Sequence, residues 1–467
     1  MTHGRHDIPS RLDRLPWTSW HWGVVVALGI TWVLDGLEVT IVGAVGPMLE
    51  RSDTLAMTAA DVGDAGMTYL AGAIVGALVL GELTDRLGRK RLFLWTLLFY
   101  VAATVATAFS WSVASFLLFR ALTGFAIGGE YAAINSAIDE LIPARHRGAA
   151  DLAINGSYWL GTAGGALSSA ILLDPRVVSP SLGWRLAFGL GALTSLAVLL
   201  VRRRVPESPR WLLQRGRARE ADAIVREVER GAGVRSSADP SGGQGEGEAG
   251  EVRGFVAVAR LMVTRYRRRA ALCLVLMATQ AFFYNAIFFT YALVLTRFYA
   301  VEPRGVGKML LPFAIGNFLG PLVLGRLFDT WGRRKLITFT YAASGLLLAG
   351  TGVLFVRGAL TPATQTLCWS VTFFFGSAAA SSAYLSASEL FPLDVRGKAI
   401  ALFYAAGTAL GGLAAPALFG RLVQTGERPA VFHGYLLGAA LMLVGAATAH
   451  VLAEDAEGKS LEELSLE

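Results

Sequence analysis

Charged residues are scarce in this chain of 467 residues. Asp, Glu, Lys and Arg together make up 16% of it, whereas soluble domains carry about 25%. Hydrophobic residues make up 54%, and the mean hydropathy is +0.50. Many of the apolar runs are long enough to cross a bilayer, which takes about 20 residues each. The composition therefore excludes an ordinary soluble domain and predicts a polytopic membrane protein.

Cysteine is also scarce. The two cysteines, Cys273 and Cys368, lie within apolar runs, and no His, Cys or Glu pair has metal-ligand spacing. The sequence contains no Gly-x-x-x-x-Gly-Lys-Ser/Thr phosphate loop and no nucleophile elbow. We therefore expect no disulfide, no metal and no cofactor, and we expect neither an enzyme nor an ATP-driven pump.

The net charge of +7 does not indicate a nucleic-acid partner. Its arginines lie in polar connectors, where the preference of Arg and Lys for the inner side of a membrane accounts for them. Connectors rich in Arg and Lys alternate with poor ones, so that the rich connectors share one side. We expect this side and both chain ends to be cytoplasmic. Richness in Arg, Ala and Gly favours a bacterial inner membrane.

Two motifs occur twice, in the same order. Residues 140–148 (ELIPARHRG) match 389–397 (ELFPLDVRG), and residues 81–91 (GELTDRLGRKR) are echoed at 325–335 (GRLFDTWGRRK). Such duplication predicts two similar halves of about 200 residues. All four copies are short polar connections between apolar runs. This is the layout of a transporter built from two repeats around a site near the midplane.

Twelve apolar runs predict an all-α protein with six transmembrane helices in each half. The expected spans are about 21–48, 62–83, 92–110, 113–142, 149–173, 184–201, 270–299, 306–328, 336–356, 364–391, 399–423 and 431–451. The expected regions are a cytoplasmic N-terminus (1–20), a six-helix bundle (21–201), a cytoplasmic linker (202–269), a second bundle (270–452) and a cytoplasmic tail (453–467).

Glycines four residues apart predict close helix packing. The pairs are Gly72 with Gly76, Gly124 with Gly128 and Gly407 with Gly411. Each pair lies on one helix face, and small residues at this spacing allow backbones to approach in lipid.

These motifs resemble the major facilitator superfamily, and within it the branch of sugar porters and related metabolite:proton symporters. The stretch 81–90 is similar to the superfamily's cytoplasmic signature. Residues 120–124 (RALTG), the loop at 140–148 and the stretch 206–212 (PESPRWL) resemble sugar-porter motifs. The resemblance implies the twelve-helix fold. Gln280 and Asn285 keep the expected five-residue separation in span seven, whereas the segment 128–131 (GGEY) is more like organic-acid symporters.

Charged residues at the motif ends form a predicted cytoplasmic gate. Arg provides a rigid fork for carboxylates, so pairs between helix ends can hold the inner side closed and separate when the halves move. The alternative is a set of static surface ion pairs. The gate residues are Asp85, Arg86, Arg89, Glu140, Arg147 and Glu207 in the first half, and Asp329, Arg333, Glu389 and Arg396 in the second.

Acidic residues within the spans predict proton coupling. Asp35 lies near the middle of span one, where a carboxylate costs about 2.5–3.5 kcal/mol unless it is paired, protonated or hydrated. Arg120 of span four is the expected partner, and the resemblance implies the same pair. Glu38 lies on a similar helix face and can share the proton or face the outer vestibule. Glu130 is a further proton or substrate site, or a buried acid satisfied by its neighbours. A permanent structural ion pair is the alternative reading of Asp35 and Arg120.

Polar and aromatic residues on the spans expected to line the cavity predict the substrate site. Such side chains suit the hydroxyls of sugars and polyols, and they also suit aromatic carboxylates. For each aromatic residue, plain helix packing is the alternative. The candidates are Asn155, Tyr158, Trp159, Gln280, Tyr284, Asn285, Tyr291, Asn317, Trp369 and Tyr384.

The leading hypothesis is proton-coupled uptake of a small polar solute by alternating access of the two halves. A sugar or polyol and an organic acid are close rivals as substrate. Proton-driven efflux of an amphipathic compound is the second hypothesis, and a sensor that binds solute without transporting it is the third. We expect a monomer whose partners are the solute, protons and the lipid bilayer.

Overall fold

The computed structural model describes residues 11, 16–143, 147–202, 207, 209–231, 254–391 and 395–453. Long helices dominate this part of the chain, and the described residues contain no β-strand. The first six long helices are α2 (Ser19–Leu49), α3 (Ala59–Leu87), α4 (Arg89–Ala108), α5 (Val113–Leu141), α6 (Arg147–Leu172) and α7 (Pro180–Arg202). Three short helices follow, namely α8 (Pro209–Gln214), α9 (Ala218–Gly231) and α10 (Phe255–Thr264).

The remaining helices are α11 (Arg267–Phe288), α12 (Tyr291–Tyr299), α13 (Pro303–Thr330), α14 (Arg333–Val356), α15 (Pro362–Glu389), α16 (Arg396–Gly407), a π-helical turn η2 (Thr408–Gly412), α17 (Ala414–Gln424) and α18 (Arg428–Leu452). Taking α11 with α12 and α16 with η2 and α17 as interrupted single spans gives the twelve predicted spans. Most helix ends lie within three residues of the predicted limits.

Nine helical stretches of the described residues are long and apolar enough to cross a membrane. The three other long helices, α6, α7 and α15, have 26, 23 and 28 residues, which exceeds or matches the length that a bilayer requires. In these three helices Ser, Thr and Gly replace part of the apolar content, because much of their surface packs against other helices and not against lipid.

The duplicated motif at residues 81–91 and 325–335 takes the same backbone conformation in both halves. Gly88 precedes α4 with φ +91°, and Gly332 precedes α14 with φ +98°. A side chain would clash in this region of φ, which is why glycine occupies both positions. The sequence repeat is therefore a structural repeat at the junction between the second and third helix of each half.

Glycine pairs bring α3 and α5 into close contact. A Cβ atom added at Gly72 would lie 1.9 Å from the carbonyl oxygen of Ala121, and one added at Gly124 would lie 1.9 Å from that of Tyr69. Gly76 and Gly128 repeat this arrangement one turn further along the same helices. The predicted close packing is confirmed, because the glycines of each helix face the backbone of the other.

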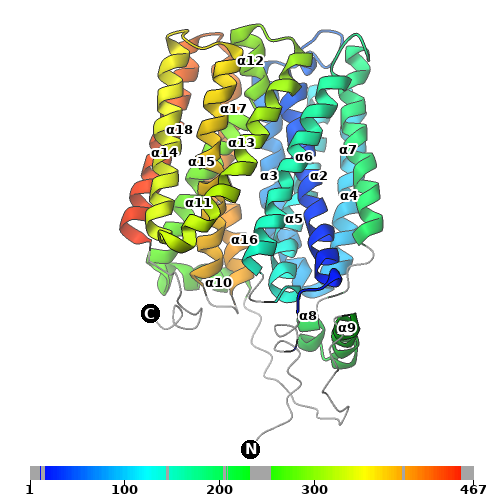
Figure 1. Ribbon diagram of the computed structural model, residues 1–467. Coiled ribbons are helices and arrows are strands. Elements are labelled where there is room, and N and C mark those ends of the chain that lie inside the picture. The colour runs from blue at the N-terminus through cyan, green and yellow to red at the C-terminus, as the bar shows by residue number, and fades with distance from the viewer. Residues whose placement is uncertain are drawn as a thin grey trace, which may run out of the picture.

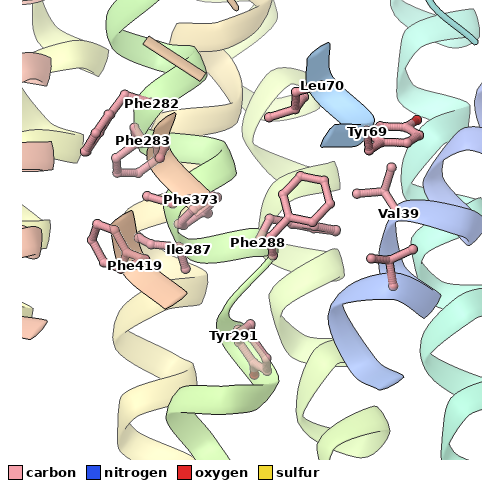
Figure 2. Packing of buried hydrophobic residues seen from close by; sticks show 14 of the residues in the cluster. Val39, Tyr69, Leu70, Phe282, Phe283, Ile287, Phe288, Tyr291, Phe373 and Phe419 are labelled. Atoms are coloured by element: carbon pink, nitrogen blue, oxygen red, sulfur yellow. The ribbon is translucent and has the colours of Figure 1, made fainter. Parts of the chain in front are cut away.

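Two of the twelve spans are interrupted, which the sequence analysis did not anticipate. Span seven breaks at Phe289 and Thr290, between α11 and α12, and Figure 2 shows this break between Phe288 and Tyr291. Span eleven contains η2, where Gly411 packs against the backbone of Ala278 in α11. π-Turns and broken membrane helices often occur at functional sites.

Helices α2–α7 gather on one side of the molecule and α11–α18 on the other (Figure 1). Across the boundary, α3 packs against α17 and α6 packs against α13. Helices α8 and α9 project from one end, which we call the α8–α9 end, and the N-terminal residue of α2 lies at this end as well (Figure 1). The hydrophobic core continues across the boundary, and Phe288 extends from α11 toward Val39 of α2 (Figure 2).

Candidate functional site: a buried charge cluster

Glu38 of α2 and Arg120 of α5 form an ion pair in the interior of the first six helices. Their side chains are almost entirely buried, with 1% and 0% of the residue exposed. Two hydroxyls from α4 complete the carboxylate shell. The Tyr100 hydroxyl donates to one Glu38 oxygen, and Thr104 donates to the same oxygen at 3.2 Å. Three helices thus converge on one ion pair, because a buried charge needs a partner and hydrogen bonds.

Asp35 lies one turn before Glu38 on α2 and accepts a hydrogen bond from the Tyr69 hydroxyl at 2.8 Å. The Tyr69 ring also covers the Arg120 guanidinium, whose central carbon lies 4.8 Å from the ring centroid. The sequence predicts that Asp35 lies opposite Arg120. The structure corrects this pairing, since Glu38 is the carboxylate bonded to Arg120. The extra turn along α2 brings Glu38 level with Arg120 in the antiparallel α5.

The cluster holds more acid than base. Asp35 and Glu38 contribute two carboxylates, and Arg120 contributes one guanidinium, all of them buried. Two nitrogens of Arg120, Nε and one terminal nitrogen, have no hydrogen-bond partner. An uncompensated charge is costly in such an environment. A single proton on either carboxylate would make the three groups neutral as a set, so the arrangement is suited to binding one proton.

Glu130 is a third buried acid, ten residues further along α5. It is 2% exposed, and its carboxylate accepts a hydrogen bond of 3.2 Å from Thr96 of α4. Asp35 and Glu130 both line a small cavity together with Thr31, Trp32, Ile127 and Ile134. Its volume of about 10 Å³ is close to the space that one water molecule needs. The charge cluster and an acid nearer the α8–α9 end thus border the same small cavity.

Aromatic side chains join the cluster to the second half of the chain. Tyr69, which bonds Asp35, packs against Phe289 with the ring centroids 6.2 Å apart. Phe289 is one of the two residues at the break between α11 and α12. Two further pairs cross the boundary beside it: Tyr158 with Phe288 at 6.5 Å and Trp159 with Tyr284 at 6.4 Å. A movement of the break would therefore displace Tyr69, which donates the hydrogen bond to Asp35.

The family model described as "Sugar (and other) transporter" matches residues 18–466. The chain belongs to this family. It is thus a transporter of the major facilitator superfamily, a multi-pass membrane protein that handles a sugar or another small metabolite, and not an enzyme.

Curated relatives of the transporter carry several substrates in their names. The chain is 27% identical to the niacin transporter NiaP of Acinetobacter baylyi over 98% of its own length and 100% of the relative's. It is 28% identical to the "Probable 4-methylmuconolactone transporter" of Cupriavidus pinatubonensis, covering 81% of this chain and 79% of that one. It is 33% identical to myo-inositol transporter 2 of Cryptococcus neoformans over 44% of this chain and 37% of the relative.

Solved structures support the fold of the transporter. The proton:xylose symporter XylE bound to 6-bromo-6-deoxy-D-glucose superposes with a TM-score of 0.73 at 18% identity, over 96% of this chain and 98% of that one. A partially occluded, inward-open structure of XylE from E. coli gives 0.74 at 16% identity, over 95% and 100%.

Some substrate candidates of the transporter lie together at the boundary between its halves, while others do not. Tyr158, Trp159 and Tyr284 meet there, and the Tyr284 hydroxyl donates to the Asn317 side chain at 2.7 Å. Asn155, Gln280 and Tyr384 are buried or half-buried at other places in the molecule.

Three candidates are used within the second half of the transporter. Asn285 donates to the Ala281 carbonyl of its own helix at 2.8 Å. Tyr291 stacks on Trp369 with the ring centroids 4.7 Å apart and donates to the backbone of Met309. Both rings are at most 1% exposed. For Tyr291 and Trp369 the packing interpretation is therefore the better one.

Most side chains of the predicted gate lie outside those that the structure describes: Asp85, Arg86, Arg89, Glu140, Arg147, Asp329, Glu389 and Arg396. Glu207 and Arg333 are described, and both are half-buried. The Glu207 carboxylate accepts a hydrogen bond of 3.3 Å from the backbone N–H of Lys90 and would be 2.5 Å from a Cβ atom at Gly88. Glu207 thus contacts the first copy of the duplicated motif.

Sequence reasoning missed the hydroxyl donors of the cluster, namely Tyr69, Tyr100, Thr104 and, at Glu130, Thr96. A single Tyr in an apolar span is equally consistent with hydrophobic packing. The sequence pattern of one helix does not show which acid on another helix its hydroxyl faces. The available signal was indirect, because a buried carboxylate requires donors on neighbouring helices. Among the described residues, no group of three His, Cys, Asp or Glu is placed to hold a metal ion.

Proposed function

We propose that this protein is a proton-coupled symporter that takes up a small polar organic solute by alternating access. The observation that carries the proposal is the buried set of Asp35, Glu38 and Arg120, in which two carboxylates and one guanidinium lie in the same interior. Such a set is neutral only when it holds one proton. Intramembrane ionisable groups of this kind mark proton relays in many transporters.

Coupling requires that the proton affinity of the cluster change with conformation. Tyr69 supplies the mechanical connection, since it donates to Asp35, covers Arg120 and packs on Phe289 at the break of span seven. When the second half moves, Tyr69 shifts, and the balance between the two carboxylates for Arg120 shifts with it. Glu130 then receives the proton through the small cavity that it shares with Asp35.

Within this proposal, a planar organic acid is favoured over a sugar as the substrate. Aromatic rings from both halves, Tyr158 and Trp159 opposite Tyr284 and Phe288, meet at the boundary. Ring faces suit a flat molecule through stacking. Niacin and 4-methylmuconolactone, named for two relatives, are flat rings with a carboxylate or lactone.

A sugar or polyol is the second candidate, and a separate observation favours it. Tyr284 and Asn317 form a hydrogen-bonded pair at 2.7 Å on neighbouring helices. A phenol and an amide together offer both donors and acceptors to hydroxyl groups. Xylose and myo-inositol occur in the names of a solved structure and a relative.

The orientation of the protein is part of the same proposal. We place the α8–α9 end, both chain ends and the linker between the two halves in the cytoplasm of a bacterium, because the Arg-rich connectors lie at this end. The duplicated motifs then form the inner gate, and Glu207 contributes to it through its contact with Lys90. The bundles extend over residues 21–201 and 270–452.

Solute uptake by proteoliposomes tests the proposal. Purified protein is supplied with a panel of aromatic carboxylates, sugars and polyols, with and without an inward proton gradient. We expect accumulation of an aromatic carboxylate that requires the gradient, and its loss in Asp35→Asn and Glu38→Gln while exchange counterflow persists. Gradient-independent transport by all three proteins would contradict coupling. Outward accumulation would indicate efflux, and binding without transport would indicate a sensor.

A further inference from the structure

Helix α10 presents two different faces. Val258 and Met262 are buried against α16 and α11, with 0% and 2% of each residue exposed. On the opposite face, Val256 and Val263 are 78% and 69% exposed. These valines are seven residues apart and therefore share one side of the helix, with Arg260 between them.

The position of α10 is the surface of the membrane. Only Arg265 and Tyr266 separate it from α11, which begins at Arg267 and spans the bilayer. Figure 1 shows α10 beside α16 at the α8–α9 end of the molecule. A helix at this depth has headgroups beside it and acyl chains just beyond them. The valines on its outer face are therefore exposed to lipid as well as to water.

Four arginines surround this outer face. Arg260, Arg265, Arg267 and Arg268 are exposed, and among the described residues none of them contacts a carboxylate. Arg265 lies over the neighbouring Tyr266 ring. The sequence contains no Asp or Glu between Glu251 and Glu302. The patch is thus uniformly positive and lies beside apolar side chains.

Helix α9 of the same chain is a useful contrast. One of its arginines is compensated: Arg226 pairs with Asp222 at 2.7 Å, and Asp222 also pairs with Arg11. Its apolar residues Ala221, Val225 and Val228 are buried against Trp211 and Leu212. Helix α9 thus has a covered apolar face and a charged face that suits exposure to water. Helix α10 has 10 residues against the 14 of α9, and among the described residues its outer face has neither counter-charges nor a covering helix.

We propose that the outer face of α10, with Arg260, Arg265, Arg267 and Arg268, is a binding surface for the headgroups of anionic phospholipids. The guanidinium groups bind lipid phosphates as charged forks, while Val256 and Val263 enter the layer of acyl chains. Basic segments beside a membrane helix are attracted to anionic lipid at about fivefold in affinity per cation. This inference does not depend on the proposed substrate or on proton coupling.

Native mass spectrometry of the purified, delipidated protein tests the surface. Phosphatidylglycerol and phosphatidylcholine are titrated separately, and the first binding constants are compared. We expect the full chain to prefer phosphatidylglycerol by at least tenfold. The variant Arg260→Gln/Arg265→Gln/Arg268→Gln should lose most of this preference. Its thermal unfolding should match the wild type, because all three side chains are exposed.

The control variant is Arg219→Gln/Arg226→Gln/Arg230→Gln, which removes the same charge from α9. It should keep the preference for phosphatidylglycerol. Equal effects of the two variants would show a general charge effect and overturn the proposal, as would equal binding of the two lipids by the wild type. Residues 454–467 carry six acidic side chains. If deleting them were required before phosphatidylglycerol binds, this segment would be the occupant of the surface, and the proposal would be wrong.

Discussion

The carboxylate of Glu38 faces the guanidinium of Arg120, while Asp35, one turn away on the same helix, is held by the hydroxyl of Tyr69. Both acids are at most 2% exposed. The two carboxylates therefore differ in role, since one neutralises the arginine and the other is stabilised by a neutral donor. This division allows them to be tested separately.

Removal of the Glu38 charge should destabilise the protein as well as uncouple it. Breaking a buried ion pair costs about 3–5 kcal/mol, because the partner charge remains unpaired. Glu38→Gln should therefore lower the thermal unfolding temperature in detergent markedly. The double variant Glu38→Gln/Arg120→Met removes the stranded charge and should recover most of the stability, with no recovery of proton-driven uptake. Equal melting of the single variant and the wild type would contradict the ion pair.

Tyr69→Phe should separate the two functions of that residue. The substitution removes the hydroxyl that Asp35 accepts at 2.8 Å but keeps the ring between Arg120 and Phe289. A hydrogen bond to a charged group contributes about 1.5–3 kcal/mol. We expect proton-driven accumulation to fall at least tenfold, with counterflow exchange retained. The matched change Tyr291→Phe removes a buried hydroxyl that is bonded within the second half and should leave coupling intact.

The glycine contact between α3 and α5 should tolerate no side chain. A Cβ atom at Gly124 would lie 1.9 Å from the backbone oxygen of Tyr69, so that Gly124→Ala must separate the helices. We expect a loss of about 1–3 kcal/mol of stability, measured by thermal unfolding. Gly189→Ala on α7 is the control, because no neighbouring atom lies within 4 Å of its added Cβ. This control should unfold at or above the wild-type temperature.

The end opposite α8 and α9 is closed by contacts between the halves. Arg421 of α17 pairs with Asp64 of α3 at 3.1 Å, and the Gln424 side chain accepts from the Ala60 backbone at 3.2 Å. Arg421→Glu should shift the equilibrium toward the form open at this end, by about two- to fivefold, because the pair is partly exposed. The population can be followed by distance measurements between spin labels across this end. Asp64→Arg/Arg421→Glu should restore the wild-type distribution, and failure to do so would exclude a direct role of the pair.

The contact of Arg11 with α9 should weaken only at acidic pH, below about pH 4. The Arg11 guanidinium bonds Glu229 at 2.7 Å and Asp222 at 2.7 Å. Burial acts to raise the pKa of Asp222, but its hydrogen bonds and charge contacts with Arg11 and Arg226 outweigh this and lower the pKa below its usual value. Because the pKa of this carboxyl is lower in the folded protein than in the unfolded chain, the ionised carboxylate stabilises the fold at pH values above the unfolded pKa, which is about 4. This stabilisation is lost as the pH falls through the folded pKa.

Protection of α9 against hydrogen exchange, corrected for the intrinsic rate, should therefore be constant from pH 8 to pH 5. It should fall below about pH 4. Arg11→Gln should show the reduced protection already at pH 7. Constant protection of the wild type down to pH 3 would contradict this account.

The twelve spans and their approximate ends followed from the sequence, because an apolar run of the right length has few alternatives in lipid. The duplicated motifs identified the repeat, and Gly88 and Gly332 adopt the same conformation. The pairs of glycines also predicted the α3–α5 contact, since spacing by four places residues on one helix face.

The partners within the membrane did not follow in the same way. Helical spacing placed Asp35 and Glu38 on similar faces of one helix, and it could not decide which of them meets Arg120. That choice depends on the relative height of the antiparallel helices α2 and α5, which is set by tertiary packing. Likewise, neither Pro nor Gly marks the break at Phe289 and Thr290.

The sequence by itself determined that this chain is a membrane transporter of two repeated halves with buried acids and a basic α10 segment. Composition, hydrophobic periodicity and motif duplication are properties of the sequence, and they do not depend on how the helices pack. Only the tertiary structure decided that Glu38 pairs with Arg120, that Tyr69 joins Asp35 to the break in span seven, and that no carboxylate among the described residues pairs with the four arginines around the outer face of α10. Each of these depends on which side chains from distant helices meet, and a buried charge is satisfied by whichever donor the packing brings to it.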